Sequence, residues 1–458
     1  MTGDFQMQRF AINDLLKWKD DPERKPLLLL GARQVGKTWL MKEFGKTHFK
    51  KCAYVSLDKN RQMADVFEHS FDIKHIILTL QIQAGFPITP GDTLIILDEI
   101  QACPAAVTAL KYFCEDAGEY HVIAAGSQLG VGNLDGTGFP VGKVDRIYLY
   151  PMTFAEFLDA TGNNQLLELI RSRDWKMIEV FQDKISDLLR YYYFIGGMPA
   201  AVASFATRQD FGRVRKIQQS LLADYRDDFG KHAPPEIKPK IEMIWDSIPA
   251  QLARENKKFI YAHVRKKESS STLEPAMGWL NDSGLISIAR RVSKPAFPLS
   301  SYKDEAFKVY FLDVGLLAAA SGLNARTIID GNRIFQEFKG ALTEQYVQQQ
   351  LIAEFGMQPY YWTSGSGQAE VDFLAESDLG IVPIEAKAEK NLQSKSLKVF
   401  CNKYQPRIAV RTSMSHYFKQ EIRFAESDAA GTSGSYTLID LPLYCIGQMM
   451  NELSAVSD

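Results

Sequence analysis

The stretch that decides the fold is Gly31-Ala-Arg-Gln-Val-Gly-Lys-Thr38, which fills every fixed position of the phosphate-binding pattern G-x-x-x-x-G-K-[ST]. The two glycines let the backbone curl, so that successive N–H groups point at phosphate oxygens. Lys37 is suited to reach the β- and γ-phosphates, and the Thr38 hydroxyl is suited to bind Mg²⁺. The apolar run Leu27–Leu30 before the loop and a helical pattern after it are the context that this loop needs. The residues expected to line the nucleotide site are Gly31, Ala32, Arg33, Gln34, Val35, Gly36, Lys37 and Thr38.

A second motif, Thr93-Leu-Ile-Ile-Leu-Asp-Glu-Ile100, is an apolar strand that ends in two adjacent carboxylates. We expect this strand to lie beside the P-loop strand, with Asp98 holding Mg²⁺ and Glu99 acting on the attacking water. A strand end with solvated charges is the alternative for these two residues alone, but the complete P-loop upstream favours catalysis. A further strand, His121–Ala125, leads into Ser127 and Gln128, which are candidates to sense the γ-phosphate or to form a simple turn.

Length and composition limit the classes of protein that the chain can represent. At 458 residues it is long enough for three or four domains, and a hydrophobic fraction of 46% with 24% charged residues is typical of a globular protein. No apolar stretch has the length of a membrane span. The five cysteines are scattered without a CxxC pair, which favours a reducing, cytoplasmic location over disulfides or structural zinc.

The pattern of hydrophobic residues predicts an α/β multidomain protein. Short apolar runs alternate with helical patterns up to about residue 150, which predicts a parallel sheet covered by helices. The strands are expected at Leu27–Leu30, Cys52–Leu57, Leu94–Leu97, His121–Ala125 and Arg146–Tyr150. A helical region follows and is interpreted as a lid on the nucleotide site. The four expected domains are a P-loop AAA-type core over 1–160, the helical lid over 161–235, a winged helix-turn-helix over 236–325, and a nuclease-like domain over 326–458.

Residues 236–325 suggest the winged helix because helical stretches precede a glycine turn and a basic β segment, Gly284–Lys294. Residues 250–300 carry nine Lys or Arg against four Asp or Glu, a local excess in a chain whose net charge is −2. Such an excess favours contact with the phosphates of double-stranded DNA. A protein-docking domain is the alternative, because winged helices are also used in that way.

The C-terminal part carries a second set of chemically active residues. Glu344 lies in a long predicted helix, Asp372 on a strand, and Glu385 and Lys387 two residues apart on the next strand. Residues i and i+2 of a strand face the same side, so Glu385 and Lys387 project together, and Asp372 can join them around one divalent ion. This is the PD-(D/E)xK nuclease arrangement, in which carboxylates hold Mg²⁺ and the lysine acts on the attacking water. A hairpin with exposed acids and a lysine is the alternative.

Taken together, these residues resemble a group of prokaryotic AAA-type P-loop ATPases whose C-terminal half is a domain of unknown function. The resemblance rests on the order of the motifs along the chain, namely Gly31–Thr38, Leu94–Glu99, Tyr150–Phe157, Gly196–Pro199, Phe311–Leu317, Gly340–Val347 and Glu370–Lys387. It implies a P-loop parallel sheet with a helical lid, a winged helix-turn-helix and a restriction-endonuclease-like α/β domain. It also implies ATP rather than GTP as the nucleotide.

The expected function is Mg²⁺-dependent binding and hydrolysis of ATP, coupled to a C-terminal half that binds DNA or another partner. Lys37, Glu99 and Ser127 are the expected catalytic residues, and Thr38 and Asp98 are the expected metal ligands. The alternatives are an ATP-regulated nuclease and a slow nucleotide switch. A homo-oligomer is expected if a neighbouring subunit supplies an arginine to the ATP site. Arg226 is one candidate for that role, and a surface salt bridge is its alternative.

Overall fold

The computed structural model describes residues 7–127, 139–254, 257–264, 270–326, 333–365, 367–388, 394–424 and 434–457. The side chains of residues 333–337 and 457 lie outside this description. The chain forms two compact units. The first contains Gln8–Tyr150 with Trp279–Leu285, and the second contains Pro151–Gly278 with Ile286–Asp458.

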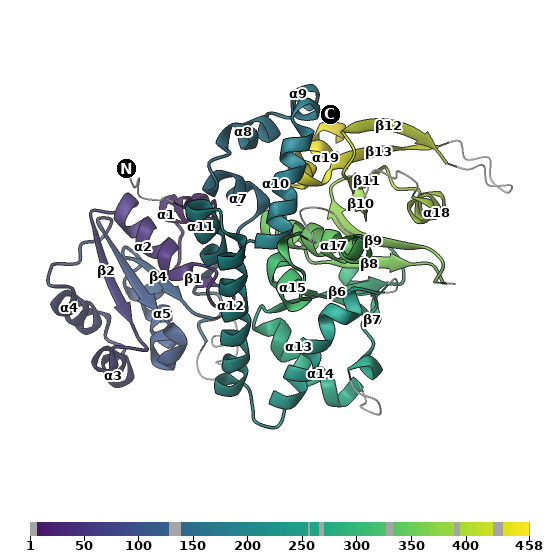
Figure 1. Ribbon diagram of the computed structural model, residues 1–458. Coiled ribbons are helices and arrows are strands. Elements are labelled where there is room, and N and C mark those ends of the chain that lie inside the picture. Colours follow the sequence, from purple (N-terminus) through teal and green to yellow (C-terminus); the bar gives the residue numbers. More distant parts are fainter. Residues whose placement is uncertain are drawn as a thin grey trace. The chain divides into compact units, whose positions relative to one another are not determined.

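Within the described residues of the first unit, five parallel strands form a sheet in the order β2-β3-β4-β1-β5 (Figure 1). Their bounds are β1 Leu27–Leu30, β2 Lys51–Ser56, β3 Thr93–Asp98, β4 His121–Ala125 and β5 Asp145–Tyr148. The helices are α1 Ile12–Asp20, α2 Lys37–His48, α3 Arg61–His69, α4 Ile73–Ala84 and α5 Pro104–Asp116. The predicted strands agree with the observed ones to within two residues at each end, which confirms the predicted parallel α/β core.

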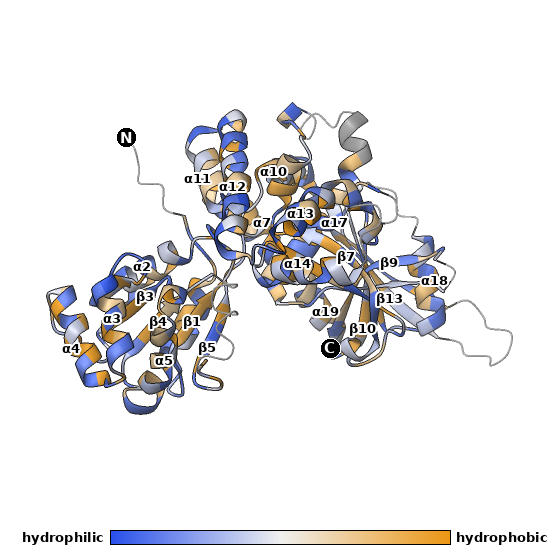
Figure 2. Ribbon diagram, turned by 90° about the horizontal axis from the view of Figure 1, so that it is seen from below, coloured by the Kyte–Doolittle hydropathy of each residue, from blue (hydrophilic) through white to orange (hydrophobic). Residues whose placement is uncertain are grey.

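The core of this unit lies on both faces of the sheet. On one face, side chains of α3, α4 and α5 pack against alternate residues of the strands, including Leu28, Ile95 and Leu97. On the other face α2 approaches so closely that a Cβ on Gly45 would lie 2.7 Å from the Cys52 sulfur. Figure 2 shows the apolar colour that runs along β1 and β4. Burial on both faces explains why these strands are continuous apolar runs rather than alternating ones.

One expectation about this sheet is wrong. The strand that ends in Asp98 does not lie beside the P-loop strand, because β4 pairs with β1 on one side and with β3 on the other. The physical consequence is local. Carboxyl ends of parallel strands meet at one edge of a sheet. Ser127 follows β4, and β4 lies between the P-loop strand β1 and the Asp98 strand β3.

The second unit begins with helices. The described ones before its sheet are α7 Phe154–Ala160, α8 Asn164–Ser172, α9 Trp175–Val180, α10 Gln182–Ile195, α11 Pro199–Arg208, α12 Phe211–His232, α13 Lys238–Leu252 and α14 Ser270–Asp282. The residues of α14 from Trp279 on are counted with the first unit. Helix α7 starts at a capping box, in which the Thr153 hydroxyl accepts from the Glu156 backbone N–H and the Glu156 carboxylate accepts from that of Thr153. The later helices are α15 Val314–Ala320, α17 Arg333–Phe355, α18 Lys395–Tyr404 and α19 Met449–Ser457.

A mixed sheet dominates the rest of the second unit. Among the described residues it has eight strands in the order β12-β13-β11-β10-β9-β8-β6-β7. Their bounds are β6 Ile286–Val292, β7 Lys303–Phe311, β8 Tyr360–Thr363, β9 Glu370–Ser377, β10 Gly380–Ala386, β11 Ile408–Ser413, β12 Phe418–Arg423 and β13 Ser435–Pro442. β9 and β10 form the predicted hairpin, and α17 has the predicted bounds. Leu397 and Phe400 of α18 pack on one face of the sheet, and α17 contacts β7 and β10.

The sheet crosses a boundary that the sequence suggested at residue 325. The basic segment Gly284–Lys294 contains β6, whose antiparallel partner is β7 and whose parallel partner is β8. Strands from the expected winged helix and from the expected nuclease-like domain are therefore hydrogen-bonded to each other in one sheet. The division into four domains stays a prediction. Across the described part of the chain, no helix is long and apolar enough to cross a membrane.

Candidate functional site

The P-loop connects β1 to α2 through backbone conformations that need its glycines. Gly36 has φ of 98°, and Gly31 has φ of 153°. A Cβ on Gly31 would lie 2.3 Å from the Leu149 carbonyl oxygen, so the loop and the segment after β5 touch through their backbones. Gln34 also has a positive φ, 64°, which non-glycine residues seldom adopt. The predicted loop residues therefore form one tight turn at the N-terminus of α2, where the helix dipole favours an anion.

Lys37 lies inside this loop and is only 8% exposed. Its Nζ donates to the carbonyl oxygens of Gly31 and Ala32, each at 2.9 Å. Burial is the largest influence on its pKa and outweighs the opposing carboxylates of Glu99 and Asp98, so that the pKa falls to about 8. The lysine is thus held at the centre of the loop with a lowered pKa. A bound phosphate oxygen would favour the protonated form and raise that pKa.

Asp98 joins the end of β3 to the start of α2. Its Oδ2 accepts from the Thr38 hydroxyl at 2.7 Å and from the Tyr54 hydroxyl at 2.9 Å. Thr38 and Asp98 are the two predicted metal ligands, and the structure brings their oxygens together. Buried oxygen donors of this kind suit Mg²⁺, so the residues present fit the expected ion. Sequence reasoning missed Tyr54, whose pKa rises to about 12 through burial and through its hydrogen bond to Asp98.

Glu99 follows Asp98 in a strained conformation. Its φ of 53° and ψ of 45° lie in the left-handed region, which costs about 1–3 kcal/mol for a non-glycine residue. Gln101 donates from its Nε2 to Glu99 Oε2 at 2.5 Å. The left-handed residue ends the extended conformation of β3 directly after Asp98. Gln101 was not predicted, although its position two residues after Glu99 was a usable signal.

Two further residues of the first unit are Ser127, which lies after β4, and Arg9, which lies against the P-loop itself. Ser127 follows β4, where Gly126 donates to the Leu29 carbonyl of the P-loop strand at 3.4 Å. The alternative sensor candidate, Gln128, lies outside the described residues. Arg9 was not predicted. It is 3% exposed and donates to the Val35 carbonyl of the P-loop and to the Tyr150 carbonyl, both at 2.6 Å. The guanidinium therefore ties the P-loop to the residue that ends this unit.

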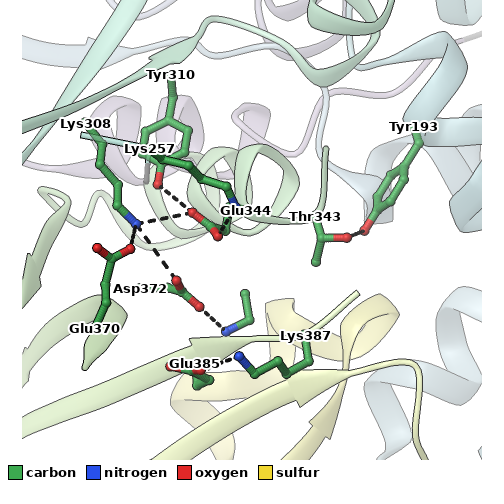
Figure 3. A network of polar contacts seen from close by, with 11 residues as sticks. Tyr193, Lys257, Lys308, Tyr310, Thr343, Glu344, Glu370, Asp372, Glu385 and Lys387 are labelled. Carbon is green, nitrogen blue, oxygen red and sulfur yellow. Dashed lines mark hydrogen bonds and ion pairs between the residues drawn. The ribbon is translucent and has the colours of Figure 1, made fainter. Parts of the chain in front are cut away.

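The second unit contains the other predicted set. Glu344 of α17 is buried, and its carboxylate forms ion pairs with Lys257 and with Lys308 of β7, the latter at 3.3 Å from Nζ to Oε2. The Tyr310 hydroxyl donates to the same oxygen at 3.3 Å. Burial alone would raise the pKa of Glu344, but the two lysines outweigh burial and lower the pKa below its usual value. Figure 3 shows both lysines directed at this carboxylate.

The other three predicted residues of this set lie close by. Asp372 Oδ2 accepts from the backbone N–H of Ala386 on the neighbouring strand at 2.9 Å, and Asp372 Oδ1 lies 3.9 Å from Lys308 Nζ. Glu385 and Lys387 form an ion pair of 2.5 Å between Oε1 and Nζ. Burial is the largest cause that raises the pKa of Asp372 and of Glu385, and Glu344 raises both further. Glu344, Asp372, Glu385 and Lys387 thus lie near one another (Figure 3), and their role as a site stays a prediction.

The lysines decide whether this cluster suits a divalent cation. Sequence reasoning missed Lys257 and Lys308, although a lysine inside the buried run Ala306–Phe311 is a signal of ion pairing. Within the part of the chain that the structure describes, no group of three His, Cys, Asp or Glu side chains is arranged to hold a metal ion. The carboxylates are paired with ammonium groups instead. In this arrangement the residues do not fit a metal ion.

The basic segment over 250–300 is used in part for internal contacts. Lys257 is paired with Glu344, and Arg291 Nε is 2.8 Å from Asp304 Oδ2. Arg290 lies over the Phe307 ring at 5.4 Å. Arg254, Lys258 and Lys294 are exposed, whereas Arg265, Lys266 and Lys267 lie outside the described residues. The excess charge counted from the sequence is therefore larger than the charge available at this surface among the described side chains.

Three family models match separate parts of the chain. Residues 23–158 match the family model of an AAA domain. Residues 186–327 match a domain of unknown function (DUF8612), and residues 339–428 match another domain of unknown function (DUF4143). The chain contains an AAA P-loop ATPase domain followed by two C-terminal domains of unknown function. This confirms the resemblance to AAA-type ATPases at that level. An ATPase domain of this class implies ATP and Mg²⁺ in general terms.

Solved structures show weak overall similarity. The Walker-type ATPase Paby2304 of Pyrococcus abyssi is 13% identical, with 69% of this chain and 96% of that chain covered at a TM-score of 0.41. Cdc6p from Pyrobaculum aerophilum is 13% identical, with coverages of 70% and 93% and a TM-score of 0.25. The Aeropyrum pernix ORC2 protein in its ADP form is 12% identical, with coverages of 73% and 92% and a TM-score of 0.28. Similarity this low carries no functional assignment. No curated protein matches the chain.

Proposed function

We propose that the first unit binds ATP with Mg²⁺ and hydrolyses it. The observation that carries this proposal is the convergence of Lys37, Thr38 and Asp98, with 2.7 Å between the Thr38 hydroxyl and the Asp98 carboxylate. Lys37 leaves the carbonyls of its own loop to hold the β- and γ-phosphates, while the loop N–H groups bind phosphate oxygens. Mg²⁺, when bound by Thr38 and Asp98, neutralises charge on those phosphates. ATP rather than GTP is proposed from the family resemblance.

The proposed role of Glu99 is to orient and polarise the attacking water, and that of Ser127 is to contact the γ-phosphate. The strained backbone of Glu99 and its hydrogen bond from Gln101 support the first role, because both direct one carboxylate oxygen. The position of Ser127 after the strand between β1 and β3 supports the second. Positioning and electrostatic stabilisation supply most of the catalysis in phosphoryl transfer, so a displaced carboxylate should slow turnover more than binding.

Two substitutions separate binding from turnover. Lys37→Ala is expected to abolish nucleotide binding, measured by fluorescence titration with an ATP analogue. Lys46→Ala, an exposed lysine on the same helix, is the control. Glu99→Gln is expected to retain binding and to lose turnover by at least about a hundredfold. Glu119→Gln, at an exposed glutamate of the same unit, controls for the lost charge. Equal ATPase rates in wild type and Glu99→Gln would remove the role given to Glu99.

For the second unit we propose binding to double-stranded DNA or to a protein partner, controlled by the nucleotide state. The exposed side chains of Arg254, Lys258 and Lys294 support a phosphate-binding face. The pairing of β6 with β7 and β8 in one sheet gives this face a regular backbone support. The test is fluorescence anisotropy of a labelled duplex at several salt concentrations. An Arg254→Ala/Lys258→Ala/Lys294→Ala variant should bind more weakly with a shallower salt dependence. Unchanged affinity would favour a protein partner.

A slow nucleotide switch is the main rival to efficient turnover. An ATPase that assembles into a homo-oligomer obtains an arginine from its neighbour, so its specific activity rises with protein concentration. Light scattering with and without ATP, beside ATPase assays over a hundredfold range of protein concentration, distinguishes the two. Activity that is independent of concentration in a verified monomer would favour the switch.

Cleavage of nucleic acid by the cluster around Glu344 is the less favoured function. The pairing of its carboxylates with lysines is the observation against it. Purified protein is incubated with supercoiled plasmid and Mn²⁺, with and without ATP, beside a Glu385→Ala/Lys387→Ala variant. The expected result is the same plasmid pattern for both proteins. Metal-dependent nicking that is lost in the variant would make this protein an ATP-regulated nuclease.

A further inference from the structure

Lys308 is a fully buried lysine at the centre of the acidic cluster. Its side chain has no exposed surface, and its Nζ lies 2.5 Å from Glu370 Oε1, 3.3 Å from Glu344 Oε2 and 3.9 Å from Asp372 Oδ1. These carboxylates come from α17 and from β9, whereas Lys308 comes from β7, at the far edge of the sheet. Figure 3 shows the ammonium group between the three acids.

The sheet is built so that this lysine can reach the acids. The residue opposite Lys308 on β6 is Ala289, whose small side chain leaves room above the sheet. The Lys308 ammonium then lies 5.0 Å from the centre of the Tyr361 ring on β8, a cation–π distance. The side chain therefore extends over β6 toward β8, and Glu370 of β9 reaches its ammonium from the other side. An aliphatic stem over apolar and aromatic neighbours with a fully paired ammonium end is a favourable way to bury a lysine.

Charge within the cluster is nearly balanced. The described members are the acids Glu344, Glu370, Asp372 and Glu385 and the lysines Lys257, Lys308 and Lys387. With all groups ionised, one net negative charge remains. A divalent ion bound by Glu344 and Asp372 would lie about 2–2.5 Å from their oxygens, and therefore against the Lys308 ammonium. Like charges at that separation repel strongly in a buried site.

We propose that the Lys308 ammonium takes the place of a divalent cation in this cluster, which is a metal-independent ionic core joining β7, β9 and α17. The second unit then resembles a metal-dependent nuclease in its strands, but a lysine side chain supplies the positive charge that a metal ion would supply. This proposal is independent of the ATPase function proposed for the first unit. One described oxygen in the cluster, Glu385 Oε2, is buried without a hydrogen-bond partner. A single such oxygen beside Lys387 is too few ligands for a divalent ion.

The first test measures Mn²⁺ binding to the full chain without nucleotide. Asp98→Asn is used as the background, so that the P-loop site contributes no signal. Electron paramagnetic resonance of free Mn²⁺ is compared between Asp98→Asn and Asp98→Asn/Asp372→Asn/Glu385→Gln. The expected result is the same binding curve for both proteins. A bound Mn²⁺ that disappears in the triple variant would overturn the proposal.

The second test removes the built-in cation. Lys308→Ala is expected to lower the melting temperature of the second unit by about 10 °C, because one partner of a buried ion pair is removed. Lys303→Ala, at an exposed lysine on the same strand, is expected to leave it unchanged. The Mn²⁺ arm of this test uses Lys308→Ala in the Asp98→Asn background, so that the P-loop site cannot contribute. If Lys308 stands in the cation position, millimolar Mn²⁺ should restore much of the loss in this variant and should not stabilise the Asp98→Asn protein.

Rescue of Lys308→Ala by Mn²⁺ without an effect on the Asp98→Asn protein supports the proposal. A folded Lys308→Ala variant that ignores Mn²⁺ overturns it, as does stabilisation of the Asp98→Asn protein that depends on Glu385. If Lys308→Ala does not fold, Lys308→Met keeps the volume of the side chain without its charge and takes its place. The Mn²⁺ titration of the Asp98→Asn protein decides the question in either case.

Discussion

The carboxylate of Asp313 accepts a hydrogen bond from the backbone N–H of Gly197 at 2.6 Å, although 116 residues separate them. The same carboxylate caps α15 by accepting from Leu316 N–H at 3.0 Å, and it accepts from Gln349 Nε2 of α17 at 3.2 Å. Burial raises the pKa of Asp313 to about 6. Motifs Gly196–Pro199 and Phe311–Leu317, recognised in the sequence only as family features, thus form one buried joint with α17.

The first prediction concerns this joint. Gly196 has φ of 73°, and a Cβ there would lie 2.0 Å from Asp313 Oδ1. Gly196→Ala should destabilise the second unit by about 2–4 kcal/mol, because both the backbone conformation and the space exclude a side chain. Urea unfolding of the full chain, followed by tryptophan fluorescence, measures the change. Gly278→Ala is the control, since no atom lies within 4 Å of its Cβ position in α14. Equal stability of the two variants would contradict the role of the joint.

The second prediction follows from the lowered pKa of Lys37, about 8. The lysine loses its proton as the pH rises through that value, and a neutral amine holds phosphate weakly. The affinity for ATP should therefore be constant below pH 7.5 and should be about tenfold weaker at pH 9. Equilibrium titrations at pH 7, 8 and 9 measure this. Lys37→Arg should bind more weakly but show a flat profile, because arginine stays charged. A flat profile in the wild type would refute the prediction.

The third prediction concerns Gln101, whose amide donates to Glu99. Gln101→Ala should lower kcat about three- to tenfold with little change in the affinity for ATP, because the carboxylate loses its orientation while the phosphate contacts remain. Steady-state ATPase kinetics and nucleotide titration separate the two quantities. Gln83→Ala, at an exposed glutamine of α4, is the matched control. A variant with weaker binding and normal kcat would place Gln101 outside the catalytic arrangement.

The fourth prediction concerns Arg226, the candidate to act on a neighbouring ATP site. Its guanidinium pairs with Asp246 of α13, and the side chains are 46% and 55% exposed. We therefore expect Arg226→Ala to change the ATPase rate less than twofold at any protein concentration. Stability should change by less than about 1 kcal/mol, as for other exposed ion pairs. A large loss of turnover with normal nucleotide binding would restore Arg226 as a catalytic arginine.

Local pattern predicted the first unit well and the second only in part. The P-loop, Asp98 and Glu99 lie at the ends of apolar runs whose neighbours along the chain decide their conformation. The order of the strands was not predictable in this way, and β4 lies where Asp98's strand was expected. In the second unit α17 and the β9–β10 hairpin were predicted because each is a local element. The pairing of β6 with β8 was not predicted from the sequence, because it joins segments that are far apart in the chain.

The amino-acid sequence by itself therefore determined the set of chemical groups and the local elements that carry them. The sequence alone shows a loop with glycines at two fixed positions, two acids at the end of an apolar strand, and Glu385 and Lys387 at the end of another. These features are local, since helix and strand periods act over a few residues. Only the tertiary structure decided the partners of those groups. Lys308 meets Glu344 and Glu370 from another strand, and Asp313 meets Gly197. Burial sets the pKa values and the pairing of charges, and burial depends on segments that are remote in the chain.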